Sequence, residues 1–171
     1  MATYKDYGFF DDENHEYVIT ERNTPRNFYN YYFNDSFISF ASQVGCGEGL
    51  IQDEPSNRAE MIADRAVYIA DKTNKKWFNA LGLPMHEAFD AFECRHGIGY
   101  STIITERENI RTETTFFVPL HEGAEYWIVK VTNLADEKRE LGVITYNDHR
   151  LDGPYQPQGY NTYQSLRFSP H

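Results

Sequence analysis

Short segments of alternating apolar and polar residues recur along the chain. The clearest covers residues 100–118, where one face carries Ile110, Thr112, Thr114, Phe116 and Val118. Successive side chains of a strand point to opposite faces, so this spacing predicts strands with one buried face. Glu108 and Asn109 in the middle of the segment predict a turn. The segment is therefore predicted to be an antiparallel hairpin.

The same alternation predicts three more hairpins. Residues 125–146 form the second, with LADEKRE as its turn, residues 9–20 turn at Asp12 to Asn14, and residues 67–78 turn at Asp71 to Asn74. SNRAEMIADRA, from Ser56, is predicted to be a short helix. Many short strands separated by turns are typical of an all-β fold, here an antiparallel β-sandwich.

The last part of the chain differs from the rest. From Asn147 onward the sequence has glycines, prolines and tyrosines but no sustained alternation. We expect residues 1–146 to form the β-sandwich core and residues 147–171 to form a long irregular loop of the same domain. The chain stops without a closing strand, which predicts an incomplete sandwich or a flexible tail.

The net charge and the hydropathy of the chain limit the classes of molecule that it could bind. A net charge of −10 at pH 7 and a pI near 5.0 argue against nucleic acid and anionic membranes, because phosphates would be repelled. The chain has no apolar stretch of the roughly 18 residues that span a bilayer and no signal-peptide core at its start. We expect a cytoplasmic protein in which Cys46 and Cys94 are reduced thiols.

The stretch FECRHGIGYSTI, residues 92–103, raises the question of nucleophilic catalysis. Cys94 and His96 are two residues apart in a strand, so their side chains face the same side and can touch. No third orienting residue or oxyanion donor can be named, and a structural corner is the better interpretation. No catalytic residue is predicted in this chain.

Other candidate motifs are better explained by structure. GCGEGL, residues 45–50, lacks the last glycine and the βαβ context of a dinucleotide loop, so a turn is predicted. Asp11, Asp12 and Glu13 could pair for glycosidic chemistry, but adjacent carboxylates in a turn point different ways. The six histidines show no metal-ligand spacing, so neither a metal nor a cofactor is expected.

Several segments together resemble the start of the glycoside hydrolase family 94 phosphorylases, which include cellobiose, chitobiose and laminaribiose phosphorylases. The resemblance is carried, in the family's order, by YGFFDDENHEYVIT (7–20), TPRNFYNYY (24–32), VYIADKTNKKW (67–77), FECRHGIGYSTI (92–103) and NIRTETTFFVPLHEGAEYWIVKVTN (109–133). It covers most of residues 7–146. It implies the N-terminal domain of a larger enzyme, with a galactose mutarotase-like super-sandwich fold.

The resemblance also implies a reaction and a site. In such enzymes an aspartic acid on a helical barrel protonates the glycosidic oxygen while inorganic phosphate attacks with inversion, releasing a sugar 1-phosphate. This sandwich would contribute to a homodimer and to the acceptor side of the cleft. By the match to NTYQSLRF, Gln164 and Arg167 would hydrogen-bond sugar hydroxyls and Tyr163 would stack on the sugar.

Two other functions stay open at this level. One is a free-standing carbohydrate-binding sandwich, for which the tyrosine-rich loop is the main support. The other is a purely structural assembly domain whose exposed aromatic residues form an interface. A reading frame that continues beyond His171 into a helical barrel would select the phosphorylase.

Overall fold

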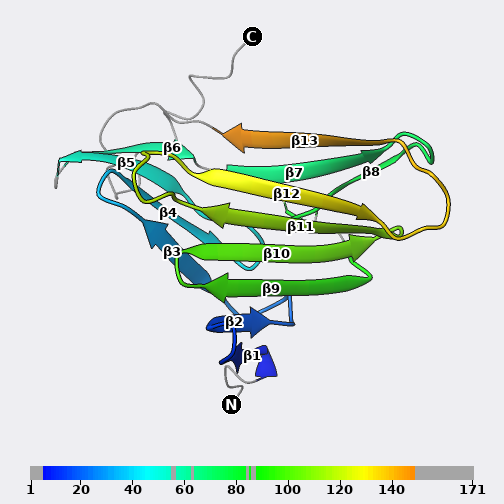
Figure 1. The fold of residues 1–171 in the computed structure, drawn as a ribbon, viewed down its shortest axis with the longest axis horizontal. Helices are drawn as coiled ribbons and strands as arrows, with labels where there is room; N and C mark the ends of the chain where they lie inside the picture. Colours follow the sequence, from blue (N-terminus) through cyan, green and yellow to red (C-terminus); the bar gives the residue numbers. More distant parts are fainter. Residues whose placement is uncertain (1–5, 55–56, 63, 84, 86–87, 149–171) are drawn as a thin grey trace, which may run out of the picture.

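The computed structural model describes residues 6–54, 57–62, 64–83, 85 and 88–148, with side chains omitted at 52–54 and 57–61. These residues form three antiparallel sheets (Figure 1). Sheet A has the order β1-β2-β9-β10-β11-β12, with strands Gly8–Asp11, Glu16–Ile19, Ala91–Gly97, Tyr100–Arg107, Ile110–Phe117 and Tyr126–Asn133. Sheet B has the order β3-β4-β5-β6, with strands Tyr29–Phe33, Phe37–Ser42, Gly49–Glu54 and Asn57–Ile62. Sheet C has the order β13-β7-β8, with strands Leu141–Asp148, Asp64–Asp71 and Lys76–Asn79.

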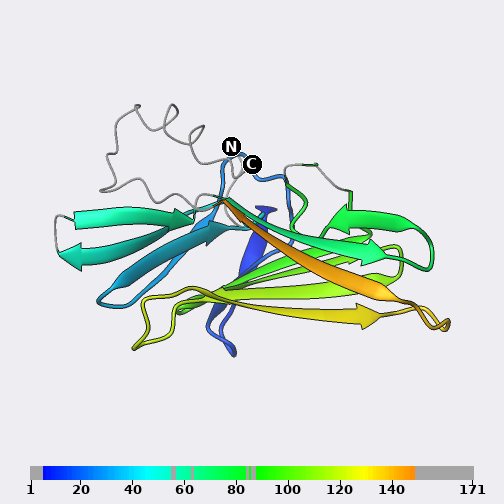
Figure 2. The same ribbon diagram turned by 90° about the horizontal axis from the view of Figure 1, so that it is seen from above.

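The sheets make two layers. Seen from above, sheet A forms one layer, and sheets B and C lie side by side in the other (Figure 2). One apolar cluster fills the space between the layers, with buried members from sheet A (Ile103, Phe116), sheet B (Tyr32, Phe37) and sheet C (Val67, Ile69). The predicted all-β antiparallel sandwich is confirmed.

The hairpin predicted for residues 100–118 is present as β10 and β11. The five alternate residues expected on its inner face, from Ile110 to Val118, are all buried. Glu108 and Asn109 have φ values of 54° and 58°, the left-handed backbone that a tight two-residue hairpin turn requires. The hairpins with turns at residues 12–14 and 71–74 are also confirmed, as β1–β2 and β7–β8.

Two sequence-based predictions are wrong. The stretch from Ser56 is not a helix, because residues 57–62 form β6 and pair with β5. Ala, Glu, Met and Arg are good helix formers, but the intrinsic preference amounts to less than about 1 kcal/mol per residue, and pairing with β5 overrides it. Residues 125–146 do not form a hairpin, since β12 pairs with β11 and β13 pairs with β7. The connector 134–140 is long enough to carry the chain from one layer to the other (Figure 2).

A buried ion pair joins the two layers. Arg65 of β7 donates from Nε and Nη2 to the carboxylate of Glu125, which directly precedes β12, at 2.7 and 2.6 Å. Arg65 Nη2 also donates to Ser39 of β4 at 2.8 Å, and Ser39 donates to Glu125. Both charged side chains have zero solvent exposure. One cluster therefore joins sheets B and C to the segment that enters sheet A.

Asn147 and Asp148, expected at the start of the C-terminal loop, are the last residues of β13. Residues 149–171, the rest of that loop, lie outside the described residues. A helix of sufficient length and hydropathy to cross a membrane does not occur in the described part of the chain.

Candidate functional site

The residues predicted to contact substrate, Tyr163, Gln164 and Arg167, all lie outside the described residues. The structure therefore does not test whether these three residues contact substrate. The described groups that could carry chemistry gather instead near the turn between β9 and β10, where the sequence reads CRHGIGY.

Cys94 and His96 lie side by side on β9, as their spacing predicts. The sulfur of Cys94 is 3.8 Å from Nδ1 of His96. Both imidazole nitrogens have oxygen partners, however: Nε2 is 2.9 Å from the carbonyl oxygen of Phe28, and Nδ1 is 2.9 Å from the hydroxyl of Ser101. A carbonyl can only accept, so Nε2 carries the proton, and the Ser101 hydroxyl donates to Nδ1.

The environment keeps this pair neutral. Cys94 has zero exposure, and burial raises the pKa of its thiol well above the ordinary value. Burial also lowers the pKa of His96, and the hydrogen bond to Phe28 opposes this shift only in part. A nucleophilic cysteine needs a depressed pKa and a free base. Cys94 and His96 therefore have the properties of a structural pair.

Asn30 of β3 fixes the turn between β9 and β10 from the other layer. Its side-chain amide donates to the carbonyl oxygens of Gly97 at 2.8 Å and Tyr100 at 2.7 Å. Gly99 has a φ of +83°, a backbone conformation that residues other than glycine adopt only at a cost in free energy. With the His96 to Phe28 bond, these contacts make CRHGIGY a corner that locks sheet B to sheet A.

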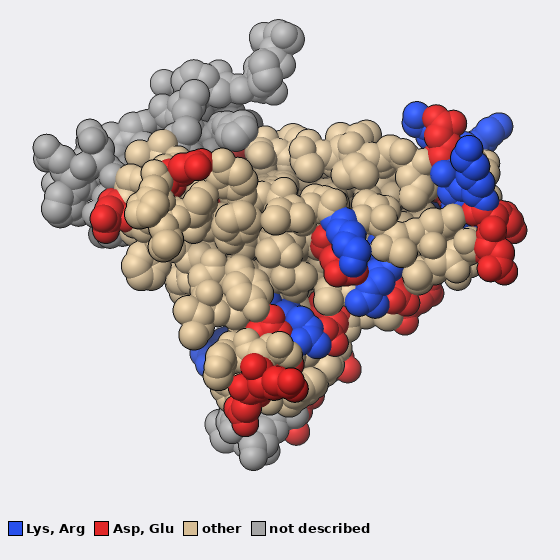
Figure 3. All heavy atoms as spheres, in the orientation of Figure 1, with Lys and Arg blue, Asp and Glu red and all other residues tan. Residues whose placement is uncertain are grey.

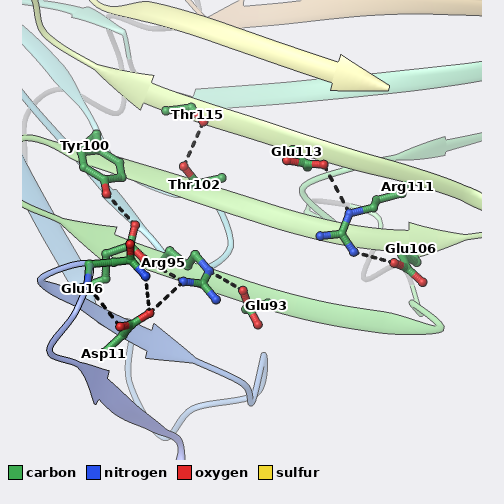
Figure 4. A network of polar contacts seen from close by, with 11 residues as sticks. Asp11, Glu16, Glu93, Arg95, Tyr100, Thr102, Glu106, Arg111, Glu113 and Thr115 are labelled. Atoms are coloured by element: carbon green, nitrogen blue, oxygen red, sulfur yellow. Dashed lines mark hydrogen bonds and ion pairs between the residues drawn. The ribbon is translucent and has the colours of Figure 1, made fainter. Parts of the chain in front are cut away.

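A network of charged groups covers the neighbouring outer surface (Figure 4). Arg95 donates to Glu93 at 2.5 Å, to Glu16 at 2.8 Å and to Asp11 at 3.3 Å. The hydroxyl of Tyr100 donates to the other oxygen of Glu16 at 2.5 Å. This bond, together with burial, raises the pKa of Tyr100 to about 12, while its bonds to Glu16 and Glu93 raise the pKa of Arg95. The network joins the β1–β2 hairpin to β9 and β10.

The carboxylates of this region do not form a glycosidase pair. Asp11 accepts from the backbone and side-chain amides of Asn14 at 3.2 and 2.8 Å, and these bonds lower its pKa. Asp11 therefore closes the β1–β2 turn, whereas Asp12 and Glu13 are exposed beside it. Among the described residues, no set of three His, Cys, Asp or Glu side chains could hold a metal ion.

The glycine-rich stretch at residues 45–50 contains the predicted turn, which joins β4 to β5, and its last two residues begin β5. Gly45 donates to the carbonyl oxygen of Ser42, and Ser42 donates to that of Cys46. Gly45 has a φ of +79°, and at Gly47 a side chain would collide with the carbonyl oxygen of Phe40. Turn geometry and close strand approach therefore explain these two glycines.

Sequence reasoning missed the network around Arg95 and the clamp by Asn30. Period-two spacing puts Glu93 and Arg95 on one face of β9, and that signal was available. Asn30 has no such signal, because its contacts at Gly97 and Tyr100 lie about 70 positions away in the chain.

Comparison with known proteins places this geometry in a family. The family model for "Glycosyl hydrolase 94, supersandwich domain" matches residues 15–159. The chain is 32% identical over 139 residues to the 3-O-beta-D-glucopyranosyl-beta-D-glucuronide phosphorylase of Paenibacillus borealis, covering 81% of this chain and 18% of the relative. It is 28% identical to the solabiose phosphorylase of the same organism, over 92% of this chain and 22% of the relative.

A third relative is the N,N'-diacetylchitobiose phosphorylase of Vibrio proteolyticus, 28% identical over 82% of this chain and 19% of the relative. The chain thus spans about a fifth of the length of the curated relatives it matches. The family match extends through both layers of the sandwich and includes the CRHGIGY corner. The chain belongs to glycosyl hydrolase family 94, as a supersandwich domain.

Proposed function

We propose that this chain is the sandwich domain of an inverting phosphorylase that acts on a β-linked disaccharide or oligosaccharide. The observation that carries the proposal is the family match over residues 15–159, together with relatives that are all named as phosphorylases. In the proposed reaction, an acid elsewhere in the enzyme protonates the glycosidic oxygen. Inorganic phosphate attacks the anomeric carbon from the opposite face and forms a sugar 1-phosphate.

The described residues support a non-catalytic role for this domain. The Cys94 thiol is kept neutral, His96 has oxygen partners on both nitrogens, and Asp11 and Glu16 are held by hydrogen bonds. The isolated chain should therefore release no sugar 1-phosphate from disaccharide and phosphate. Detection of that product above a blank with pure protein would contradict the proposal.

We place the direct contribution to substrate binding at Tyr163, Gln164 and Arg167, on the acceptor side of the cleft of a homodimer. A neutral hydrogen bond contributes about 0.5 to 1.5 kcal/mol and a charged one about 1.5 to 3 kcal/mol, so Arg167→Ala should weaken acceptor binding more than Gln164→Ala. In the synthetic direction both variants should raise the KM for the acceptor and leave that for the sugar 1-phosphate nearly unchanged. Unaltered acceptor kinetics in an intact dimer would show that these residues are scaffold.

The proposed enzyme class is tested by the reading frame of the gene and by the activity of its full-length product. A reading frame that continues past His171 into a helical barrel, whose product converts a disaccharide and phosphate to a sugar 1-phosphate, is the expected result. A stop codon after His171 would favour a free-standing domain.

A further inference from the structure

A hollow of about 510 Å³ lies beside the network of Figure 4. It is bounded by the β1–β2 hairpin, by β3 and by the turn between β9 and β10. Six of its twelve lining residues are polar, including Asp12, Glu16 and Asn30, and the apolar ones include Phe10, Tyr31 and Ile98. A concave surface with this many polar groups beside exposed rings suits a polar ligand that also has an apolar face.

The apolar lining is exposed yet held in place. Phe10, Tyr31 and Ile98 are 63%, 57% and 88% exposed. Phe10 packs against the ring of Tyr17 with centroids 4.9 Å apart, and Tyr31 packs against Phe40 at 5.2 Å. Each ring is thus supported by a second ring while keeping exposed surface. Rings held in this way lose little conformational entropy when a ligand stacks on them.

The polar groups in the hollow are oriented acceptors. Asn30 directs its NH₂ group at two carbonyl oxygens, which fixes which amide atom is nitrogen, and its Oδ1 accepts no hydrogen bond from the described residues. Glu16 is held by Tyr100 and Arg95, one on each carboxylate oxygen, and the 7% of its side chain that stays exposed is what it offers to a ligand. Exposed Asp12 adds a third acceptor. This set suits a ligand that brings hydroxyl donors.

The charge of the residues around the hollow determines which hydroxyl-bearing ligands can bind there. Asp11, Glu16 and Glu93 all pair with the one guanidinium of Arg95, and Asp12 also lines the hollow, so the carboxylates outnumber the cation and the local field is negative. Acidic side chains are seen gathered over the β1–β2 end of sheet A in Figure 3. Phosphate or carboxylate on a ligand would be repelled here.

We propose that this hollow binds a neutral saccharide, whose C–H face stacks on Tyr31 or Phe10 and whose hydroxyls donate to Glu16, Asn30 and Asp12. The choice of a saccharide over another polyhydroxylated ligand rests on the proposed function. The hollow gives the domain a sugar contact built entirely from β1, β2, β3 and the CRHGIGY corner.

The experiment is a titration of the ¹⁵N-labelled 171-residue chain, followed by NMR, with four probes. Cellobiose and N,N′-diacetylchitobiose are neutral, and glucose 1-phosphate and cellobionic acid are anionic. We expect saturable shifts at residues 10–17, 30–31 and 96–99 with at least one neutral sugar, and at least tenfold weaker binding of both anionic probes. Asp12→Asn should narrow that difference. Shifts with none of the neutral sugars, or equal binding of the anionic probes, would overturn the proposal.

Matched variants separate stacking from general effects. Loss of an aromatic contact is worth about 0.5 to 1.5 kcal/mol, so Tyr31→Ala or Phe10→Ala should weaken binding by up to about tenfold. Phe9→Ala is the control, because Phe9 is 53% exposed on the same strand but does not line the hollow. Equal losses in Phe9→Ala and Tyr31→Ala, with circular dichroism showing both folded, would contradict the stacking role.

Failure of this inference and failure of the proposed function give different results. Gln164→Ala and Arg167→Ala should leave the titration unchanged. If they abolish the shifts while Tyr31→Ala does not, the hollow is not the site, although the acceptor-side proposal gains support. If the hollow binds sugar but the reading frame lacks a barrel, the inference stands and the phosphorylase proposal falls.

Discussion

Replacing Glu125 by Gln should destabilise the domain strongly, because it removes the negative charge that compensates a fully buried Arg65. The two side chains have zero exposure and are joined by two N–H to oxygen bonds of 2.7 and 2.6 Å. Nη1 of Arg65 is buried without a hydrogen-bond partner among the described residues, so Glu125 and Ser39 supply the described hydrogen bonds of the guanidinium, which also lies over the ring of Phe116. Breaking a buried pair from one side costs about 3 to 5 kcal/mol.

That cost is a large part of the roughly 5 to 15 kcal/mol that stabilises a typical domain. The assay is urea unfolding of the 171-residue chain at pH 7, followed by tryptophan fluorescence. With a slope of about 2 kcal/mol per molar urea, the midpoint should fall by about 1.5 to 2.5 M. The matched control is Glu140→Gln, because the Lys72–Glu140 pair is 59% and 72% exposed. An exposed pair contributes only about 0 to 1 kcal/mol.

The double replacement Arg65→Met with Glu125→Leu tests the cause of the loss. An apolar pair of similar size removes both charges, so it should recover most of the stability lost in Glu125→Gln. The reasoning is refuted if Glu125→Gln costs no more than Glu140→Gln, or if the double variant is less stable than Glu125→Gln alone.

Three further outcomes are expected. Cys94→Ser should lower the free energy of unfolding by about 1 to 2 kcal/mol and change the turnover of the proposed phosphorylase by no more than a few fold; a folded variant without turnover would support Cys94 as a nucleophile after all. Because burial lowers the pKa of His96, the imidazole binds a proton more readily in the unfolded chain than in the folded one. The free energy of unfolding should therefore decline as the pH falls below about 6.5, the ordinary pKa of histidine. In urea midpoints measured from pH 7.5 to 5.5, His96→Gln should flatten that decline. Gly99→Ala should cost about 1 to 2 kcal/mol, since its φ is +83° although no atom lies near the added carbon, while Gly142→Ala, at an ordinary φ with its nearest atom at 3.7 Å, should change the midpoint little.

The sequence predicted local structure well where the signal is local. The turn at Glu108 and Asn109 follows from an Asn between two alternating segments, and the contact between Cys94 and His96 follows from period-two spacing. Which strands pair with each other was harder to predict from the sequence. Alternation in β12 shows which side chains face the core, but it carries no information about which neighbour a strand pairs with, and β13 shows no alternating burial at all.

The candidate site shows the same limit. That Cys94 and His96 serve structure was predicted, but the oxygens that hold His96 come from Phe28 and Ser101, on separate elements. The hollow beside Glu16 is assembled from three chain segments, so its lining could not be read from any one motif. Tyr163, Gln164 and Arg167 stay predictions.

The pairing of β7 with β13 has a consequence for biosynthesis. Ile69 is opposite Val143 and Val67 is opposite Thr145. During synthesis, one edge of β7 therefore stays unpaired until the ribosome has added the residues of β13, more than 70 positions later. A ribosome adds about 5 to 20 residues per second, so β7 spends several seconds with only the four residues of β8 beside it. Contacts this distant in sequence also slow folding once the chain is complete. Nascent chains that end before Leu141 should therefore depend on chaperones more than chains that include β13.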